Sequence, residues 1–205
     1  ARDAEIAFLR SQINPHFLHN ALNAIAELCV DMPDKAEQLT LQLSRYLRSC
    51  IQFKQLDSLT GLRNELELVE AYAVIEQARF GERLEIRYEV DADPHMRIPP
   101  LILQPLVENA IRHGVMSRAR GGRVTVSVKR LDEGEVRFAV EDDGVGMSAR
   151  KLEEVLQPDA SKNGVGLWNI GRRLKLLYDR SLRIDSAEGE GTRVTFELPV
   201  RSPDG

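Results

Sequence analysis

The stretch "QPLVENAIRHG", residues 104–114, combines an apolar helix face with four polar side chains of different chemistry. Helical spacing puts the apolar residues on one face: Leu106, Val107, Ala110 and Ile111. The same spacing puts the polar residues together on the opposite face: Glu108, Asn109, Arg112 and His113. A carboxylate, a carboxamide, a guanidinium and an imidazole are thus predicted to share one surface. Taken alone, a solvated face with a Glu108–Arg112 ion pair explains the stretch more simply.

A glycine-containing turn follows at "EDDGVGM", residues 141–147. Asp142 comes at the end of a predicted strand, where its carboxylate could accept a hydrogen bond from an exocyclic amine such as that of adenine. Gly144 and Gly146 permit positive φ and a close approach of the backbone to a ligand. An ordinary Asp-Gly turn accounts for the same residues if they are considered alone.

Two more glycine-containing stretches complete the series. "NGVGLWNIGRRL", residues 163–174, has glycines directly before a helix, whose N-terminal N–H groups form a ready anion site. "GEGTRVTFEL", residues 189–198, has Gly-x-Gly-Thr directly before the last strand. A loop and a tight hairpin turn are the ordinary explanations. The order and spacing of all four stretches over residues 108–192 are harder to attribute to chance.

From residue 83 onward the hydrophobic pattern has the period of two that is typical of strands. The predicted strands are "LEIRYEV" (84–90), "RVTVSVKR" (123–130), "EVRFAVE" (135–141), "LRIDSA" (182–187) and "TRVTFELPV" (192–200). Helices are predicted between them at about 100–113, 148–156 and 166–179. We therefore expect an α/β sandwich over residues 81–205.

Residues 1–80 carry a helical pattern instead, so the fold class is α+β. The first apolar stripe consists of Ile6, Leu9, Ile13, Phe17, Ala21, Ala24 and Leu28, widened by Leu18, Leu22, Ile25 and Cys29. The second has coiled-coil spacing: Leu39, Leu43, Tyr46, Cys50 and Phe53. A third helix over about 62–79 is expected to link the two halves. The hairpin has more apolar face than it can cover itself, which predicts a dimer that closes a four-helix bundle.

Composition excludes several classes of protein. The 205 residues are 42% hydrophobic, which is enough for a packed core, and the net charge of −4 gives no electrostatic footprint for nucleic acid or an anionic membrane. Cys29 and Cys50 lie far apart, so neither a zinc site nor a redox pair is predicted. No apolar run reaches the length of a membrane span. We expect a cytoplasmic fragment whose upstream part is missing.

The four stretches of the second half resemble the N, G1, G2 and terminal G-x-G-T boxes of the ATP-binding GHKL (Bergerat-type) fold. Histidine kinases, gyrase-type ATPases and certain anti-sigma factors share it. The resemblance makes Asn109 the Mg²⁺ ligand, Asp142 the adenine contact and Glu108 the general base. It places the remaining residues around ATP or the lid over its phosphates: Arg112, His113, Gly144, Gly146, Gly164, Gly166, Leu167 and Thr192.

The first half indicates which member of that group is present. "QINPHFLHNALN", residues 12–23, is similar to the histidine box of the LytS/YehU-like sensor histidine kinases. "QARFGERLEI" (77–86) and "PPLILQPLVENAIRHG" (99–114) resemble the same family, so the resemblance covers nearly the whole chain. It implies that ATP phosphorylates His16 and that a response regulator receives the phosphate on an aspartate. Residues 1–80 would be the dimerisation and phosphotransfer module.

Helical spacing supports an exposed His16. It belongs to a polar stripe beside the apolar face: Gln12, His16, Asn20, Asn23 and Glu27. Pro15 is predicted to bend the helix just before it, and His19 is expected to be a packing or supporting residue. Phe17 stands where many histidine kinases have an acidic proton acceptor, so the acceptor must come from elsewhere. The segment between Gly146 and Gly164 is short and has no phenylalanine, so lid behaviour known from longer segments need not transfer.

Two alternatives remain at this point. A non-catalytic dimeric switch of the same fold would bind ATP without any phosphate on His16. An anti-sigma-type serine kinase or a clamp ATPase would share the ATP site, but such proteins lack a Pro-His-Phe hairpin upstream. If the kinase interpretation holds, we expect the cytoplasmic portion of a membrane sensor that contacts the membrane only through a missing N-terminal segment.

Overall fold

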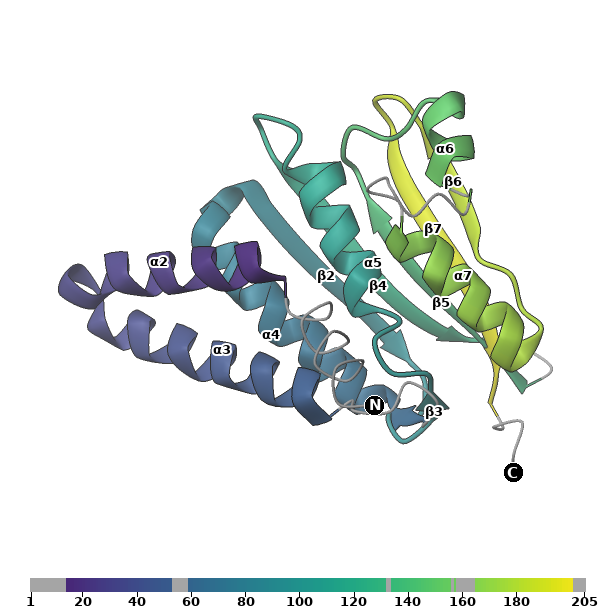
Figure 1. Cartoon of the computed structure of the whole chain (residues 1–205), viewed down its shortest axis with the longest axis horizontal. Helices are drawn as coiled ribbons and strands as arrows, with labels where there is room; N and C mark the ends of the chain where they lie inside the picture. The colour runs from purple at the N-terminus through teal and green to yellow at the C-terminus, as the bar shows by residue number, and fades with distance from the viewer. Residues whose placement is uncertain (1–13, 53–58, 132–133, 156, 158–164, 201–205) are drawn as a thin grey trace, which may run out of the picture.

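The computed structural model describes residues 14–52, 59–131, 134–155, 157 and 165–200 (Figure 1). Its helices are α2 (Pro15–Asp31), α3 (Pro33–Gln52), α4 (Leu62–Phe80), α5 (Gln104–Asn109), α6 (Ala149–Val155) and α7 (Val165–Tyr178), with a 3-10 turn η1 (Gly81–Arg83) and a π-helical turn η2 (Ala110–Val115). Its strands are β1 (Thr60–Gly61), β2 (Leu84–Asp91), β3 (Arg97–Ile98), β4 (Gly122–Arg130), β5 (Glu135–Asp142), β6 (Arg183–Ala187) and β7 (Gly191–Pro199). A helical hairpin followed by an α/β sandwich is the α+β architecture that the sequence predicts.

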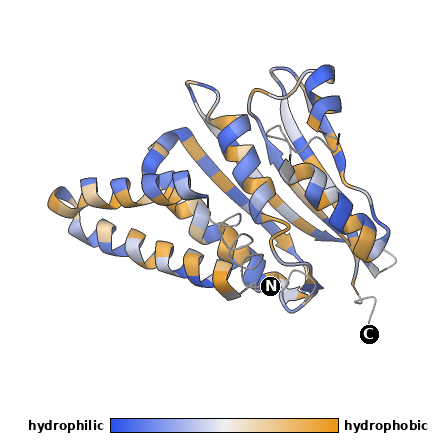
Figure 2. Cartoon of the chain, viewed as in Figure 1, coloured by the Kyte–Doolittle hydropathy of each residue, from blue (hydrophilic) through white to orange (hydrophobic). Residues whose placement is uncertain are grey.

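The main sheet has the strand order β2-β4-β5-β7-β6. β2 and β4 run parallel, and the other neighbours are antiparallel. Hydrophobic and hydrophilic residues alternate along β2 in Figure 2, although only Leu84, at the start of this edge strand, is buried. Helices α5 and α7 lie on one side of the sheet (Figure 1). Outward-pointing residues of neighbouring strands form ion pairs, such as Arg137 with Glu197 at 2.8 Å. The short β1–β3 pair was not predicted, because two residues carry no period.

The helical half is held together by an aromatic cluster. Phe17 of α2 is buried, with its ring centroid 5.0 Å from Tyr46 of α3 and 4.7 Å from Tyr72 of α4. The seam predicted for the second helix is confirmed, because every member that the structure describes is buried: Leu39, Leu43, Tyr46 and Cys50. The start of α2 is therefore fixed against both other helices.

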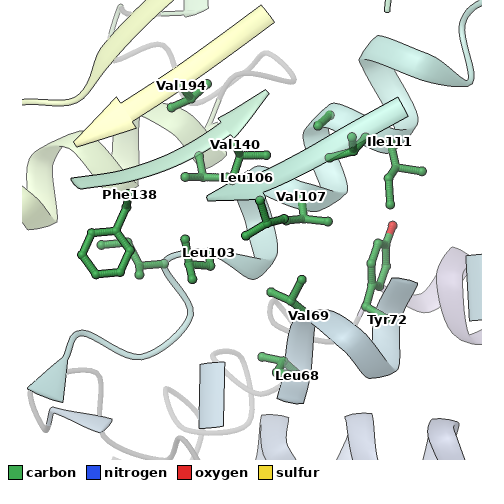
Figure 3. Close-up of a cluster of buried hydrophobic side chains, with 14 of the residues drawn as sticks. Leu68, Val69, Tyr72, Leu103, Leu106, Val107, Ile111, Phe138, Val140 and Val194 are labelled. Carbon is green, nitrogen blue, oxygen red and sulfur yellow. The ribbon is translucent and has the colours of Figure 1, made fainter. Parts of the chain in front are cut away.

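Helix α4 packs on the sandwich as well as on the hairpin. Figure 3 shows Leu68, Val69 and Tyr72 of α4 facing side chains that lead to the sheet. Those side chains, all buried, are Leu103, Leu106, Val107, Ile111, Phe138, Val140 and Val194. One continuous hydrophobic core thus joins the helix that carries the "QPLVENAIRHG" stretch to the linker helix.

The sequence predicts that Pro15 bends a continuous helix. In the structure Pro15 instead begins helix α2. Asn14 has extended backbone angles and is the N-cap of α2, and Pro15 occupies the first turn, where its missing N–H has no helical partner to lose. A residue before proline is also driven away from helical angles. The expected effect on the Ser11 carbonyl, and the stripe before Asn14, lie outside the described residues.

The helix predicted for residues 100–113 starts later and changes type. Glu65 of α4 accepts hydrogen bonds from the backbone N–H groups of Leu101, Ile102 and Leu103, which keeps this segment as a loop before α5. Leu101 has a φ of 55° there. After Asn109 the helix continues as the π-helical turn η2. In the described part of the chain, no helix combines the length and the hydrophobicity that crossing a bilayer requires.

Candidate active site

A cavity of about 320 Å³ lies between α5, η2, α6 and α7 above strands β5 and β7. Its wall is formed by Leu106, Asn109, Ala110, His113, Gly114, Val140, Asp142, Val145, Gly146, Met147, Lys151, Val155, Leu167, Thr192 and Val194. The wall is mostly apolar, with a few polar groups, as is usual for small-molecule sites. All four stretches singled out in the sequence contribute to it.

Asp142 is the buried acid of the cavity. It ends β5, is 5% exposed, and accepts a hydrogen bond from the Gly144 N–H at 2.9 Å. Burial raises the pKa of this carboxyl to about 6, and the neighbouring Asp143 charge adds to the rise. Thr192 of β7 is its partner in the strand pairing. A buried acceptor in an apolar wall suits a ligand that brings its own N–H donor.

The glycines let three loops pack on one another behind the cavity. A Cβ at Gly144 would lie 2.1 Å from the carbonyl carbon of Gly114, and one at Gly146 would lie 1.8 Å from the Ala187 carbonyl oxygen. Backbone bonds join the same loops, from Val145 N to Gly114 O at 3.2 Å and from Gly189 N to Val145 O at 2.7 Å. Gly146 reaches the cavity wall, whereas Gly144 serves the packing behind it.

The four polar residues of "QPLVENAIRHG" do not share one surface, contrary to the sequence prediction. Asn109 and His113 line the cavity, whereas Glu108 and Arg112 pair with each other at 3.0 Å outside it. Successive residues of a helix point about 100° apart. Glu108 and Arg112 therefore form one column along the helix, Asn109 and His113 form the next, and the two columns face different neighbours. Only one column reaches the cavity.

The rim of the cavity carries groups suited to phosphates. Lys151 of α6 and His113 line it, and burial lowers the pKa of His113, with Arg112 adding to the effect. Gly166, at the start of α7, lies beside Asn109, since a Cβ there would be 3.6 Å from Asn109 Nδ2. Leu167 closes the wall. Gly164 lies outside the described residues.

Asn109 offers a side-chain oxygen at the cavity wall, and oxygen is what Mg²⁺ prefers. Over the described ranges, no cluster of three or more His, Cys, Asp or Glu residues could hold a metal ion. Mg²⁺ usually takes one or two protein ligands and completes its shell with water and phosphates. Asn109 therefore fits a metal that arrives with a nucleotide.

His16 lies on the surface, as predicted, in the first turn of α2. Asn14 Oδ1 accepts hydrogen bonds from the backbone N–H groups of His16, at 3.1 Å, and Phe17, at 3.4 Å. Asn20 Nδ2 lies 3.2 Å from Nδ1 of His16. His19 is exposed too, 3.2 Å from Asn23 Nδ2, so it does not pack inside the chain, and the supporting role expected as its alternative stays a prediction.

Glu108 joins the two halves of the molecule. Its Oε1 accepts a hydrogen bond from Asn14 Nδ2 at 2.8 Å, across 94 residues of sequence, and one from Arg112 at 3.0 Å. Gln104 Nε2 lies 3.3 Å from Oε2. The residue that caps the helix of His16 is thus bonded directly to the helix that lines the cavity.

Sequence reasoning missed three residues that shape the site. Lys151 is one basic residue in a charged segment and carries no distinguishing signal. Ser186 bonds to Met147 N and to Thr192 Oγ1, each at 2.9 Å, a role visible only once β6 and β7 are paired. Glu65 did leave a signal, because it is a carboxylate at an apolar position of the third helix, between Leu62 and Val69.

Comparison with known proteins covers both halves of the chain. The family model described as "Histidine kinase" matches residues 4–84, and the model described as "Histidine kinase-, DNA gyrase B-, and HSP90-like ATPase" matches residues 99–202. Sensor histidine kinase YpdA of Escherichia coli (strain K12) is 44% identical over 97% of this chain and 35% of YpdA. Sensor protein LytS of Bacillus anthracis is 42% identical over 98% of this chain and 35% of LytS. The chain thus spans about a third of the length of these relatives.

A solved structure supports the fold. The histidine kinase domain from the Erythrobacter litoralis EL346 blue-light activated histidine kinase matches with a TM-score of 0.53, covering 91% of this chain and 96% of that one at 16% identity. The family models cover the helical and the sandwich half in turn, and relatives above 40% identity align along almost the whole chain. The chain belongs to the LytS-like sensor histidine kinases, and its second half is their ATP-binding domain.

Proposed function

We propose that this chain is an ATP-dependent protein-histidine kinase that phosphorylates His16 and passes the phosphate to an aspartate of a response regulator. Residues 1–80 serve as the dimerisation and phosphotransfer module, and residues 81–205 as the catalytic domain. One observation carries the proposal. His16 is exposed on α2, and the N-cap of α2 bonds to α5, the helix that lines a cavity framed by glycines.

In the proposed complex the adenine lies in the apolar part of the cavity. Its exocyclic amine donates to Asp142, beside Thr192, while Leu167 and Val140 contact the ring. The phosphates extend toward the rim, where Lys151 and the start of α7 offer positive charge and N–H groups. Gly144 and Gly146 hold the loop behind the ring, and Gly166, with Gly164 ahead of it, begins the phosphate side.

The transfer needs positioning more than covalent chemistry. The unprotonated ring nitrogen of His16 attacks the γ-phosphorus in line, a nitrogen–phosphorus bond forms, and the bond to the β–γ bridging oxygen breaks, so that ADP leaves. The proton on the other ring nitrogen passes to Glu108 as general base. His113 and Arg112 offset phosphate charge nearby. Asn109 holds the Mg²⁺ that accompanies ATP, and this ion supplies charge neutralisation at the phosphates.

The partners follow from the surfaces of the helical half. A second copy of the chain covers the outer face of the α2–α3 hairpin and closes a four-helix bundle. The receiver domain of a response regulator reaches His16, which lies at the surface. We place the chain on the cytoplasmic side of a membrane sensor; its relatives YpdA and LytS are named a sensor histidine kinase and a sensor protein.

Incubation with γ-labelled ATP tests the function. We expect acid-labile, alkali-stable label on the wild-type chain and none on His16→Ala. His19→Ala is the matched control, because His19 is exposed on the same helix, and it should label normally. Equal labelling of His16→Ala would refute the assignment of His16. ATP binding without any label on the wild-type chain would instead establish the non-catalytic nucleotide switch.

A further inference from the structure

The Asn14 side chain uses both of its ends, and the two ends serve different halves of the molecule. Its oxygen accepts from the backbone N–H groups of His16 and Phe17 at the start of α2. Its nitrogen donates to Glu108 on α5 at 2.8 Å. An N-cap needs only the oxygen. The second bond, to a carboxylate on a distant helix, is therefore unexplained by the local needs of α2.

The bond to Glu108 is a strong one for its position. Hydrogen bonds to an ionised acceptor are roughly twice as strong as neutral ones, and Glu108 is itself held by Arg112 at 3.0 Å. The side chain of Glu108 is 20% exposed, so water competes only partly for it. On the other side, Phe17 is buried between Tyr46 and Tyr72. Both partners of the bond are thus anchored in packed structure.

With this bond in place, His16 is not among the residues that line the nucleotide cavity of its own chain. The cavity wall includes Asn109 and His113 but neither Glu108 nor His16. Figure 1 shows α5 between the start of α2 and helix α7, and the cavity lies on the α7 side, where Leu167 lines it. While Asn14 is bonded to Glu108, the start of α2 stays against the other side of α5.

We propose that Asn14 is a positioning residue for phosphotransfer: its bond to Glu108 keeps His16 in a waiting position, and this bond must open before His16 reaches a γ-phosphate. The inference rests on the proposed kinase function. Opening also removes one of the two hydrogen bonds that Oε1 of Glu108, the proposed general base, accepts, and leaves the one from Arg112. The same movement therefore releases the nucleophile and one of the two bonds on its base.

Two substitutions at Asn14 separate the cap from the bond to Glu108. Asn14→Ser keeps a good N-cap but is too short and lacks the amide donor. Asn14→Asp also keeps the cap, and its charge repels Glu108. The matched control is Asn23→Ser, which removes an exposed amide of the same helix; among the residues that the structure describes, this amide bonds locally, to His19.

The measurement is the initial rate of γ-phosphate labelling of the whole 205-residue chain at saturating ATP, with binding of a non-hydrolysable ATP analogue measured alongside. We expect Asn14→Ser to raise the rate about tenfold, the effect of losing one hydrogen bond to a charged acceptor, and Asn14→Asp to raise it further. Analogue affinity should stay unchanged, because Asn14 does not line the cavity. Asn23→Ser should match the wild-type rate.

A rise in rate is a result that mere damage to the fold would not produce. Unchanged labelling in both Asn14 variants would overturn the inference while leaving the kinase function intact. A lower rate would also overturn it, because Asn14 would then belong to the reacting arrangement. Absence of label from the wild-type chain as well as the variants would refute the proposed function itself, and the inference with it.

Discussion

In the α/β half, three loops close on one another through glycine contacts and backbone hydrogen bonds, and they leave a cavity with a buried acid at its end. In the helical half, the α2–α3 hairpin buries one set of apolar side chains and leaves other large ones exposed, among them Leu22, Val30, Leu41 and Ile51. A shallow groove also runs along α3, lined by Thr40, Leu43, Ser44, Leu47, Arg48 and Ile51.

The difference teaches which half needs a partner. The described wall of the cavity is built by the α/β half, from Leu106 to Val194, without a residue of the α2–α3 hairpin. Apolar side chains gathered at the surface mark an interaction site in soluble proteins. The proposed second copy would cover the groove of α3 and leave the cavity unaltered. The two halves should accordingly respond to different kinds of substitution.

The largest effect is expected where the loops of the cavity meet. In Gly144→Ala the new Cβ would lie 2.1 Å from backbone of Gly114, which cannot move without shifting η2. Overpacking of this kind costs about 3 kcal/mol, and ATP binding should be lost. The matched control is Gly171→Ala in α7, whose Cβ would meet only Leu182 at 3.7 Å. It should gain about 0.5–1 kcal/mol of stability.

Chemical denaturation and ATP titration of both variants measure these effects. Wild-type stability and ATP affinity in Gly144→Ala would show that the loops are not packed as tightly as the structure has them. A destabilised Gly171→Ala would show that a Cβ at this position of α7 has less room than the 3.7 Å contact with Leu182 indicates.

The main elements of the fold were predictable because their hydrophobic residues recur with a clear helical or strand period. The seam of α3 and the alternation along β4 and β5 identified their buried residues, and the observed strands start and end within about two residues of the prediction. The two-residue strands were not predictable, and neither was the late start of α5. Its start depends on Glu65, which lies 36 to 38 residues away in sequence from the N–H groups that it binds.

The candidate site was predictable in its residue types and only partly in its geometry. The glycines and Asp142 identified the loops. Few residues other than glycine permit such close backbone contacts. The division between Glu108 and Asn109 was missed, since helical spacing alone treats neighbouring columns as one face. Pro15 was misinterpreted for a related reason: a proline looks like a defect until Asn14 is recognised as a cap, and "Asn-Pro" before an apolar run is a signal for a helix start.

The next-largest effect is expected at the exposed groove of α3 in the helical half. Ile51 lines the groove of α3 and is 48% exposed, so Ile51→Asp should leave the single chain folded but bury an unpaired charge in the proposed dimer. We expect the dimer dissociation constant to rise roughly a hundredfold. Val74→Asp, at a 40% exposed position of α4, is the control and should not dissociate the dimer. Analytical ultracentrifugation distinguishes them, and an unaffected dimer in Ile51→Asp would place the interface elsewhere.

The smallest effect concerns Asp142 and pH. Burial raises the pKa of Asp142 to about 6, from an ordinary value of 3.8. Between these values the folded chain holds a proton that the unfolded chain has lost, so the Asp142 contribution to stability falls as pH rises from about 4 to about 6. Binding of ATP works in the opposite direction, since the ionised carboxylate is the better acceptor for the adenine amine.

We therefore expect ATP affinity to fall by up to about tenfold per pH unit below pH 6, over and above the titration of the phosphates. Asp142→Asn isolates the effect of the protein, because it shares the phosphate titration but has no carboxyl to protonate. Its affinity should be lower at pH 8 and should change with pH only as the nucleotide does. Parallel pH profiles of wild type and Asp142→Asn would show that Asp142 does not hold the adenine, and the cavity would then bind its ligand by shape and apolar contact alone.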